Sequence, residues 1–279
     1  MEIIMYEPTF VPKLSHRCDS LSNIKFTAVY SNDYLTPEDP RIDPFHIHDY
    51  TELFFNLSEE VSFLVNNNVY SIGLGEAVVS LPGDVHRCIF NRSGMQEHVC
   101  IWIDAPVDSA ISFLKDSAQK HVFSDEERKT VISLVKALAE ACKSDGREIN
   151  KASLLFQILA FFENSEKNFD KSFIPEAVQS ILDDINENFA TIRSVGDVVR
   201  RHYLSASTMT RWFKSYINST PREYLESVRL AAAVNLLLCG ESVTDACMKS
   251  GFSDCSHFII LFKRKFGKTP HQYKKQLKL

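Results

Sequence analysis

The segment FHIHDYTE, residues 45–52, places His46, His48 and Glu52 close together, and His86 follows a Pro-Gly turn later in the chain. Imidazole nitrogens and carboxylate oxygens are ligands of divalent transition metals. If the segment is a strand, His46 and His48 point the same way, because strand side chains alternate. The spacing therefore predicts a cluster of metal ligands made of His46, His48, Glu52 and His86.

The same side chains suit two other roles, and the sequence leaves all three open. Polar and aromatic groups that converge in a concave site are typical of a small-molecule pocket. Under that interpretation an effector is bound by His46, His48, Tyr50, Glu52, His86, Arg87 and Trp102. The third interpretation is structural support of the fold. No cofactor is expected, unless the first interpretation holds and the cluster binds a divalent metal.

A second group of polar side chains lies in SASTMTRWFKSYI, residues 205–217. At helical spacing the apolar residues share one face. The other face carries Ser207, Thr210, Arg211 and Lys214. An arginine fork pairs with guanine O6 and N7, a threonine contacts a thymine methyl or a base edge, and a lysine suits phosphate. The pattern is typical of a helix that enters the major groove of DNA.

These side chains belong to a unit that occurs twice. SVGDVVRRHYLSASTMTRWFKSYINSTPREY, residues 194–224, is echoed by SVTDACMKSGFSDCSHFIILFKRKFGKTPHQY, residues 242–273. Four residues recur at an offset of 48 and five more at an offset of 49. Each copy reads as a short helix, a tight turn and a second helix with a basic side. The repeat predicts two helix-turn-helix units.

In each unit a serine, Ser205 or Ser253, is expected to cap the second helix. The second unit exposes two adjacent isoleucines, Ile259 and Ile260, which give no directional readout of bases. We therefore expect the first unit to discriminate bases and the second to grip the DNA backbone. The full set predicted to contact DNA is Ser205, Ser207, Thr208, Thr210, Arg211, Lys214, Ser253, Cys255, Ser256, Ile259, Ile260, Lys263, Arg264 and Lys268.

Residues 221–239, between the two units, form one uninterrupted helical pattern from Pro221 to the residue before Gly240. A helix of that length is a rod of roughly 28 Å. Successive major-groove segments on one side of a duplex lie roughly 34 Å apart. The rod is therefore expected to hold two recognition helices about one turn of DNA apart.

Charge is unevenly distributed along the chain, whose net charge is −5. Residues 1–170 carry 15 Lys and Arg against 26 Asp and Glu, whereas residues 171–279 carry 16 against 10. A basic segment joined to an acidic one indicates a polyanion partner for the C-terminal part. The seven cysteines include no CxxC pair and are expected to be reduced in a cytoplasmic protein. No signal peptide or membrane-spanning run is expected.

The remaining pattern predicts a sheet domain followed by helices. Residues 24–104 contain short β-branched and aromatic runs separated by turn signals, which favour an antiparallel barrel or sandwich. Two helical patterns follow, one opening near Ser124 and one over 149–163. The polar residues 166–174 are expected to link a domain of residues 1–165 to one of residues 175–279.

The C-terminal residues carry a family resemblance. TPREYLESVRLAAAVNLLL and GFSDCSHFIILFKRKFGKTPHQYKK make residues 175–276 resemble the DNA-binding domain of AraC/XylS-type bacterial transcription regulators. The resemblance implies seven helices with two helix-turn-helix units. It implies base-facing positions at Ser207, Thr210, Arg211, Cys255, Ser256, Ile259 and Ile260. Tyr203 stands where that family usually has a turn glycine, and Cys247 where alanine is usual.

The N-terminal half resembles a second pattern. HIHDYTELFF and GEAVVSLPGDVH are similar to the two signature motifs of the cupin barrel and to the sensor half of many AraC-type regulators. The expected fold class is α+β. It consists of an N-terminal cupin-like antiparallel β-barrel with flanking helices, and an all-α C-terminal domain with two helix-turn-helix units.

These observations predict a DNA-binding transcription regulator, not an enzyme, controlled by a small-molecule effector such as a sugar or related metabolite. Two alternatives remain, a metal-dependent cupin enzyme with a DNA-binding appendage and a regulator without any effector. The expected partners are double-stranded DNA, the effector, a second copy bound through helices in 125–163, and RNA polymerase. No membrane partner is expected.

Overall fold

The structure is a computed structural model, and it describes residues 24–37, 45–90, 92–105, 111–116, 120–164, 166–167 and 174–277. The described residues form two compact units that separate between residues 173 and 174, apart from Phe45, which groups with the second unit. The first unit contains the strands described here, and the second is helical. Within the predicted linker 166–174, Glu166–Lys167 form a short strand, while 168–173 lie outside the described residues.

The strands of the first unit form two antiparallel sheets. Their bounds are β1 Lys25–Leu35, β2 Thr51–Asn56, β3 Val61–Val65, β4 Asn68–Ile72, β5 Ala77–Ser80, β6 His86–Ile89, β7 Gly94–Asp104, β8 Lys120–Val122 and β9 Glu166–Lys167. One sheet has the order β1-β7-β2-β5-β8-β9, and the other has the order β4-β3-β6. The α+β class is confirmed.

The expected closed barrel is wrong in one respect: the described strands pair as two separate sheets. Closure requires a continuous ladder of backbone hydrogen bonds around the ring. Here the ladder beyond β6 shrinks to a single bridge, in which the amide nitrogens of His46 and His86 each donate to the other's carbonyl oxygen.

Side-chain alternation along β2 explains how one strand serves two cores. Leu53 and Phe55 face a core shared with the helices, whereas Phe54 faces a core shared with the three-stranded sheet. Successive strand side chains point to opposite faces, so both faces of β2 are buried. Glu52 lies two residues from Phe54 and therefore shares its inner face, between the two sheets.

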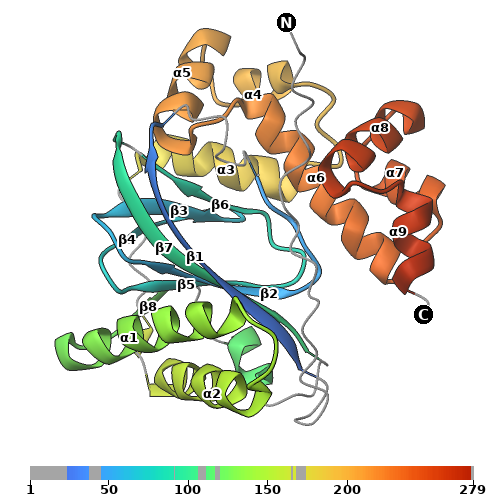
Figure 1. Cartoon of the computed structure of the whole chain (residues 1–279). Helices are drawn as coiled ribbons and strands as arrows, with labels where there is room; N and C mark the ends of the chain where they lie inside the picture. The colour runs from blue at the N-terminus through green and yellow to red at the C-terminus, as the bar shows by residue number, and fades with distance from the viewer. Residues whose placement is uncertain are drawn as a thin grey trace, which may run out of the picture. The chain divides into compact units, whose positions relative to one another are not determined.

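Helices α1 (Asp125–Cys142) and α2 (Glu148–Asn164) lie side by side against the six-stranded sheet (Figure 1), after a short 3-10 helix at Ser112–Asp116. The α1 pattern begins at Ser124, as expected, because Ser124 and Glu127 form a reciprocal capping box. Residues such as Val135 and Leu155 complete the core with the sheet. The helices thus cover the face of the sheet opposite Glu52.

Residues 174–277 contain seven α-helices, the number that the family resemblance implied. Their bounds are α3 Glu176–Asn188, α4 Val195–Arg201, α5 Ala206–Ile217, α6 Pro221–Leu238, α7 Val243–Lys249, α8 Cys255–Phe266 and α9 Pro270–Leu277. The long α6 starts at Pro221 behind a capping box of Thr220 and Glu223. Among the described helices, none has the length and apolarity needed to cross a bilayer.

Candidate functional site

The first repeat forms α4, a turn and α5. Ser205 caps α5 as predicted, because its hydroxyl accepts a hydrogen bond from the amide of Thr208 at 3.0 Å. Met209, Phe213 and Ile217 are buried on one face of α5. The opposite face is exposed and carries Ser207, Thr210, Arg211 and Lys214. Thr208, also predicted to contact DNA, is half-buried.

The turn between α4 and α5 contains Tyr203 in the left-handed conformation, with φ of +52°. Its side chain is 96% exposed, so it gains little packing in return for this strained backbone. A glycine is usual here in the resembling family because glycine adopts positive φ freely. The tyrosine therefore leaves a large aromatic group projecting beside the recognition helix.

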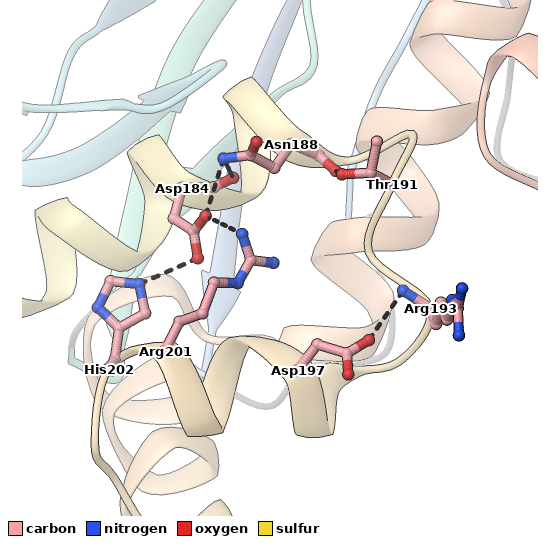
Figure 2. Close-up of polar contacts among 7 residues, drawn as sticks. All are labelled: Asp184, Asn188, Thr191, Arg193, Asp197, Arg201 and His202. Atoms are coloured by element: carbon pink, nitrogen blue, oxygen red, sulfur yellow. Dashed lines mark hydrogen bonds and ion pairs between the residues drawn. The ribbon is translucent and has the colours of Figure 1, made fainter.

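A polar network fixes the end of α4 on α3, and Figure 2 shows its members. The Asp184 carboxylate on α3 pairs with Arg201 at 2.6 Å and with His202 Nε2 at 3.1 Å. Asn188 donates to the same carboxylate at 2.9 Å. The turn into α5 begins directly after His202. The network therefore holds in place the end of α4 from which that turn starts.

The second repeat forms α7, a turn and α8. Gly251 occupies the turn with φ of +86°, and a Cβ there would lie 2.8 Å from Ala190 Cα. Ser253 was expected to cap α8, and that prediction is wrong: the cap is Asp254, whose carboxylate accepts from the amide of Ser256 at 2.8 Å. Aspartate caps as well as serine does, so Ser253 is left exposed before the helix.

The exposed side of α8 differs in chemistry from that of α5. Ile259 and Ile260 are 38% and 65% exposed, with Phe258 and Phe262 buried behind them. Ser256 and the cationic residues predicted to grip DNA are also exposed: Lys263, Arg264 and Lys268. Cys255 is half-buried, and its thiol lies against that of Cys247.

Arg229 on α6 is a positioning residue that the sequence analysis missed. Its guanidinium donates to the carbonyl oxygens of Phe189, at 3.0 Å, and Ile192, which lie between α3 and α4. It also lies over the ring of Phe252, 5.8 Å from the centroid, at the turn before α8. One side chain thus ties both helix-turn-helix units to the rod between them. The available signal was an arginine among the apolar residues Val228, Leu230 and Ala231 of that rod.

In the unit that contains the strands, a buried cluster of polar side chains centres on Glu52. Its Oε2 lies 3.1 Å from His48 Nε2 and 3.5 Å from His86 Nε2, and it accepts from Trp102 Nε1 at 2.7 Å. Trp102 is directly opposite Glu52 in the pairing of β2 with β7. All three members of the triad, His48, Glu52 and His86, are less than a tenth exposed at the side chain.

Backbone contacts fix the tautomer of both imidazoles. His48 Nδ1 lies 2.8 Å from the carbonyl oxygen of Tyr50, and His86 Nδ1 lies 3.1 Å from that of Asp84. Because a carbonyl oxygen only accepts, Nδ1 carries the hydrogen in each neutral ring. Both Nε2 lone pairs then face the Glu52 carboxylate, and three electron-rich atoms need a proton or a cation between them.

Burial and charge act in opposite directions on the pKa values of the triad. Burial alone raises the pKa of Glu52, but His48 and His86 hold it well below its usual range. Burial lowers the pKa of His86, yet the contact with Glu52 outweighs it and the pKa rises. For His48 burial prevails and the pKa falls. The carboxylate is therefore ionised, and His86 is the imidazole that accepts a proton more readily.

The structure brings only some of the predicted pocket residues together. His46 stacks on His86 with ring centroids 5.5 Å apart, and Tyr50 stacks on His48 at 3.8 Å. The three ligand atoms that lie within 4.8 Å of one another belong to His48, Glu52 and His86, so His46 stands outside the triad. Arg87 follows His86 on β6 and therefore lies on the opposite face of that strand.

The interior between the sheets holds further polar atoms. Ser80 and His98 share the inner face of the six-stranded sheet with Glu52, by their pairing with Glu52 and Asn56. Among the described residues of this interior, Ser80 Oγ and His98 Nδ1 are buried without a hydrogen bond. A buried polar atom without a partner is costly. A ligand that forms hydrogen bonds with these orphan atoms therefore removes that cost and gains binding free energy.

The triad also fits a divalent cation by its donor chemistry. Two imidazoles whose Nδ1 atoms are held by carbonyl oxygens, together with one carboxylate, form a three-ligand set with the outer contacts typical of metal-binding histidines. A cavity of about 730 Å³ lies elsewhere in this unit, at the start of α1, and contains none of the predicted effector-binding residues. It is lined by Val122, Phe123, Ser124, Glu126, Glu127, Thr130 and Phe161.

Comparison with known proteins finds a family model that matches the helical unit and relatives that align with most of the chain. Residues 198–276 match a family model described as "Helix-turn-helix domain". The HTH-type transcriptional activator RhaR of Mannheimia succiniciproducens is 23% identical, over 95% of this chain and 98% of its own length. RhaS of Klebsiella pneumoniae is 26% identical, over 81% of this chain and 86% of its own length. The solved structure of ToxT from Vibrio cholerae O395 is 18% identical, covers 91% of this chain and 99% of its own, and has a TM-score of 0.38.

The matched domain includes both helix-turn-helix units, and the relatives RhaR and RhaS, each aligned over more than four fifths of the chain, are transcriptional activators. The alternative of a metal-dependent enzyme with a DNA-binding appendage is therefore set aside. The protein is a DNA-binding transcription regulator with a helix-turn-helix domain at residues 198–276.

Proposed function

We propose that this regulator is a transcriptional activator in which the sheet unit receives a signal and the helical unit binds two adjacent major-groove segments. The observation that carries the proposal is the pair of capped helices, α5 and α8, each buried on one face. The exposed face is polar on α5, and on α8 it combines cationic residues with two isoleucines. The relatives RhaR and RhaS, both activators, support the direction of control.

The base-reading role falls to α5. Arg211 and Thr210 are exposed on it and offer the directional hydrogen bonds that distinguish base pairs. The exposed isoleucines of α8 offer contact with thymine methyls only, and Lys263, Arg264 and Lys268 supply phosphate contacts. Selection of bound duplexes from a random pool tests this division. Strong base preference under one unit and weak preference under the other supports it, and equal preference under both contradicts it.

The proposed signal is a small polar molecule, a sugar or related metabolite, bound between the sheets near Glu52. The buried carboxylate and the orphan atoms of Ser80 and His98 support a polar ligand at this place. Thermal-shift screening of the full chain against sugars is the test. A shift that is lost in Glu52→Gln supports the site, whereas a shift kept in that variant places the ligand elsewhere.

A divalent cation is the second candidate occupant, favoured by the geometry of His48, Glu52 and His86. Bound there, the cation would neutralise the facing carboxylate and lone pairs and join the two sheets. Metal analysis of the purified full chain is the test. Stoichiometric zinc that is lost in His48→Ala and His86→Ala supports the metal, and metal-free protein after growth in zinc contradicts it. If sugars and metal both fail, the regulator without an effector stands.

We further propose that two copies associate through α1 and α2 and that the protein acts in the cytoplasm on RNA polymerase at the promoter. Ile149 on α2 is 78% exposed, and the exposed face of that helix also carries Ser153, Gln157 and Ala160. Sedimentation of wild type and Ile149→Glu is the test. A dimer that dissociates in the variant supports this surface, and a wild-type monomer at micromolar concentration contradicts it.

A further inference from the structure

Two thiols meet inside the second helix-turn-helix unit. Cys247 lies in α7 and is fully buried, and Cys255 is the first residue of α8. Their Sγ atoms are 2.8 Å apart. Carbon atoms in packed side chains stay about 3.5–4.0 Å apart, whereas bonded sulfurs are about 2.05 Å apart. The two sulfurs are therefore already closer than ordinary packing contact.

The surroundings of this pair define distinct roles for the two thiols. Cys247 Sγ donates to the carbonyl oxygen of Phe252 at 3.9 Å, under the turn that Gly251 makes. Burial raises the pKa of Cys247 to about 12, so this thiol keeps its proton until it reacts with Cys255. Cys255 is only half-buried, at an exposed surface of the unit. It is the thiol that an oxidant in solution can reach.

Other described cysteines lack this combination. Cys88 and Cys100 line the core between the two sheets, where burial raises the pKa of both thiols. Cys239 is exposed, and no sulfur contact of its own joins it to the pair. Cys142 lies on α1, where burial raises the pKa of its thiol. Among the described cysteines, the contact between two sulfurs is thus the one between Cys247 and Cys255.

We propose that Cys247 and Cys255 form a reversible disulfide when a peroxide reaches the protein, and that this bond weakens DNA binding by the second helix-turn-helix unit. Position 247 holds a cysteine where the resembling family usually has alanine. Cys255 is one of the residues predicted to contact DNA. The chemistry of the bond is independent of DNA, and only its consequence rests on the proposed function.

The reaction balances with hydrogen peroxide as the oxidant. The Cys255 sulfur attacks one peroxide oxygen, the O–O bond breaks, and Cys255 sulfenic acid and one water form. The Cys247 sulfur then attacks the Cys255 sulfur, and the Cys247 proton leaves with the expelled hydroxyl as a second water, which completes the disulfide. Two thiols lose two hydrogens, and one peroxide is reduced to two waters. A dithiol such as dithiothreitol reverses the bond by exchange.

The consequence for DNA follows from where the bond sits. It ties the first turn of α8 to α7 and draws the Cys255 side chain inward, away from Ser256 and Ile259 on the exposed face. A recognition element must be held within about 0.5 Å of its productive geometry. The oxidised unit therefore loses contacts under α8, while α5 keeps its own contacts.

The experiment uses the full chain and a duplex that the reduced protein itself selects from a random pool. The protein is treated with hydrogen peroxide, alkylated, digested and analysed by mass spectrometry, and binding is measured in parallel. The expected result is a linked pair of peptides carrying Cys247 and Cys255, two hydrogens lighter than the reduced pair. Affinity falls about tenfold, with loss of protection under α8 only, and dithiothreitol restores both.

Three variants serve as controls. Cys247→Ala and Cys255→Ser should show neither the link nor the fall in affinity, whereas Cys239→Ser should respond as wild type does. The proposal is overturned by a stable sulfenic acid on Cys255 without a link, by a link that leaves affinity unchanged, or by an equal fall in affinity in the Cys247→Ala protein. Linkage without any selected duplex would overturn the DNA-binding function instead.

Discussion

Arg211 and Lys214 are three residues apart on α5, and both side chains are exposed beside buried Phe213. Their chemistry assigns them different tasks on DNA. The planar guanidinium of arginine can hold guanine O6 and N7 together, whereas the compact ammonium of lysine acts on phosphate as a point charge. Substitutions at these two positions should therefore have different signatures.

Arg211→Ala is expected to cost about 1–3 kcal/mol of specific binding and to relax base preference at one position. Lys214→Ala should weaken binding to every sequence and reduce the steepness of the salt dependence by about one unit. Fluorescence anisotropy with selected and scrambled duplexes at several salt concentrations measures both. Equal losses on the two duplexes for Arg211→Ala would contradict its assignment to base readout.

Trp102→Phe tests the buried carboxylate of Glu52. The indole nitrogen donates to Glu52 Oε2 at 2.7 Å, and a hydrogen bond to a buried charge contributes about 1.5–3 kcal/mol. We expect the variant to lose a comparable free energy of unfolding, measured by urea denaturation followed by circular dichroism. The double variant Trp102→Phe with Glu52→Gln should lose less than the sum of the two single losses. Simple additivity would mean that the bond contributes nothing.

At the scale of elements, helix caps contribute to the free energy of unfolding. The second repeat offers two neighbouring residues, Ser253 and Asp254, for a matched comparison. Asp254→Ala removes the side chain that accepts from the first turn of α8 and should cost about 0.5–2 kcal/mol of the free energy of unfolding. Ser253→Ala, one residue earlier, should change it little. Thermal unfolding of both variants is the measurement. A greater loss in Ser253→Ala would restore serine as the cap.

The cap of α4 should make the helical unit sensitive to acid. Hydrogen bonds from the backbone amides of Ser194 and Arg193 hold the pKa of Asp197 below its ordinary value of 3.8. A lowered folded pKa stabilises the fold above the unfolded value, and that stabilisation is lost as pH falls through the folded value. Wild type should therefore unfold at a higher temperature than Asp197→Asn at pH 7, and the difference should shrink as pH falls below the ordinary value of 3.8 and through the lowered folded pKa. A difference that persists there would contradict the assignment.

Sequence patterns predicted the elements well where a local rule decides them. Ser124 and Ser205 cap helices as expected, and Pro221 opens the long rod, because caps and proline act on their own turn. The cap of α8 was missed by one residue, since serine and aspartate are equivalent capping residues and stand side by side. Local patterns left that choice undecided.

Sequence patterns did not predict the features that depend on contacts between residues far apart in the chain. The separation of the strands into two sheets depends on where the ladder beyond β6 stops, at the His46–His86 bridge. At the same bridge His46 stacks on His86, yet its ring stays outside the triad. The link from Arg229 to Phe189 and Phe252 joins residues from three elements. No spacing rule predicts such a contact.

At the scale of the molecule, α6 is the element that joins the two helix-turn-helix units into one DNA-binding domain. Its 18 residues span about 27 Å, somewhat less than the roughly 34 Å between major-groove segments on one side of a duplex. Both units pack against it, through contacts with α3, α5, α7 and α9. A single chain is therefore expected to cover two adjacent groove segments on one side of DNA.

Hydroxyl-radical footprinting of the full chain on the upstream region of its own gene, with and without candidate metabolites, tests this claim most directly. The expected pattern is two protected patches on one face of the duplex, about one helical turn apart, with Arg211→Ala weakening the patch under α5. A region without any protected sequence under any of these conditions, or a single patch of half that length, would contradict it.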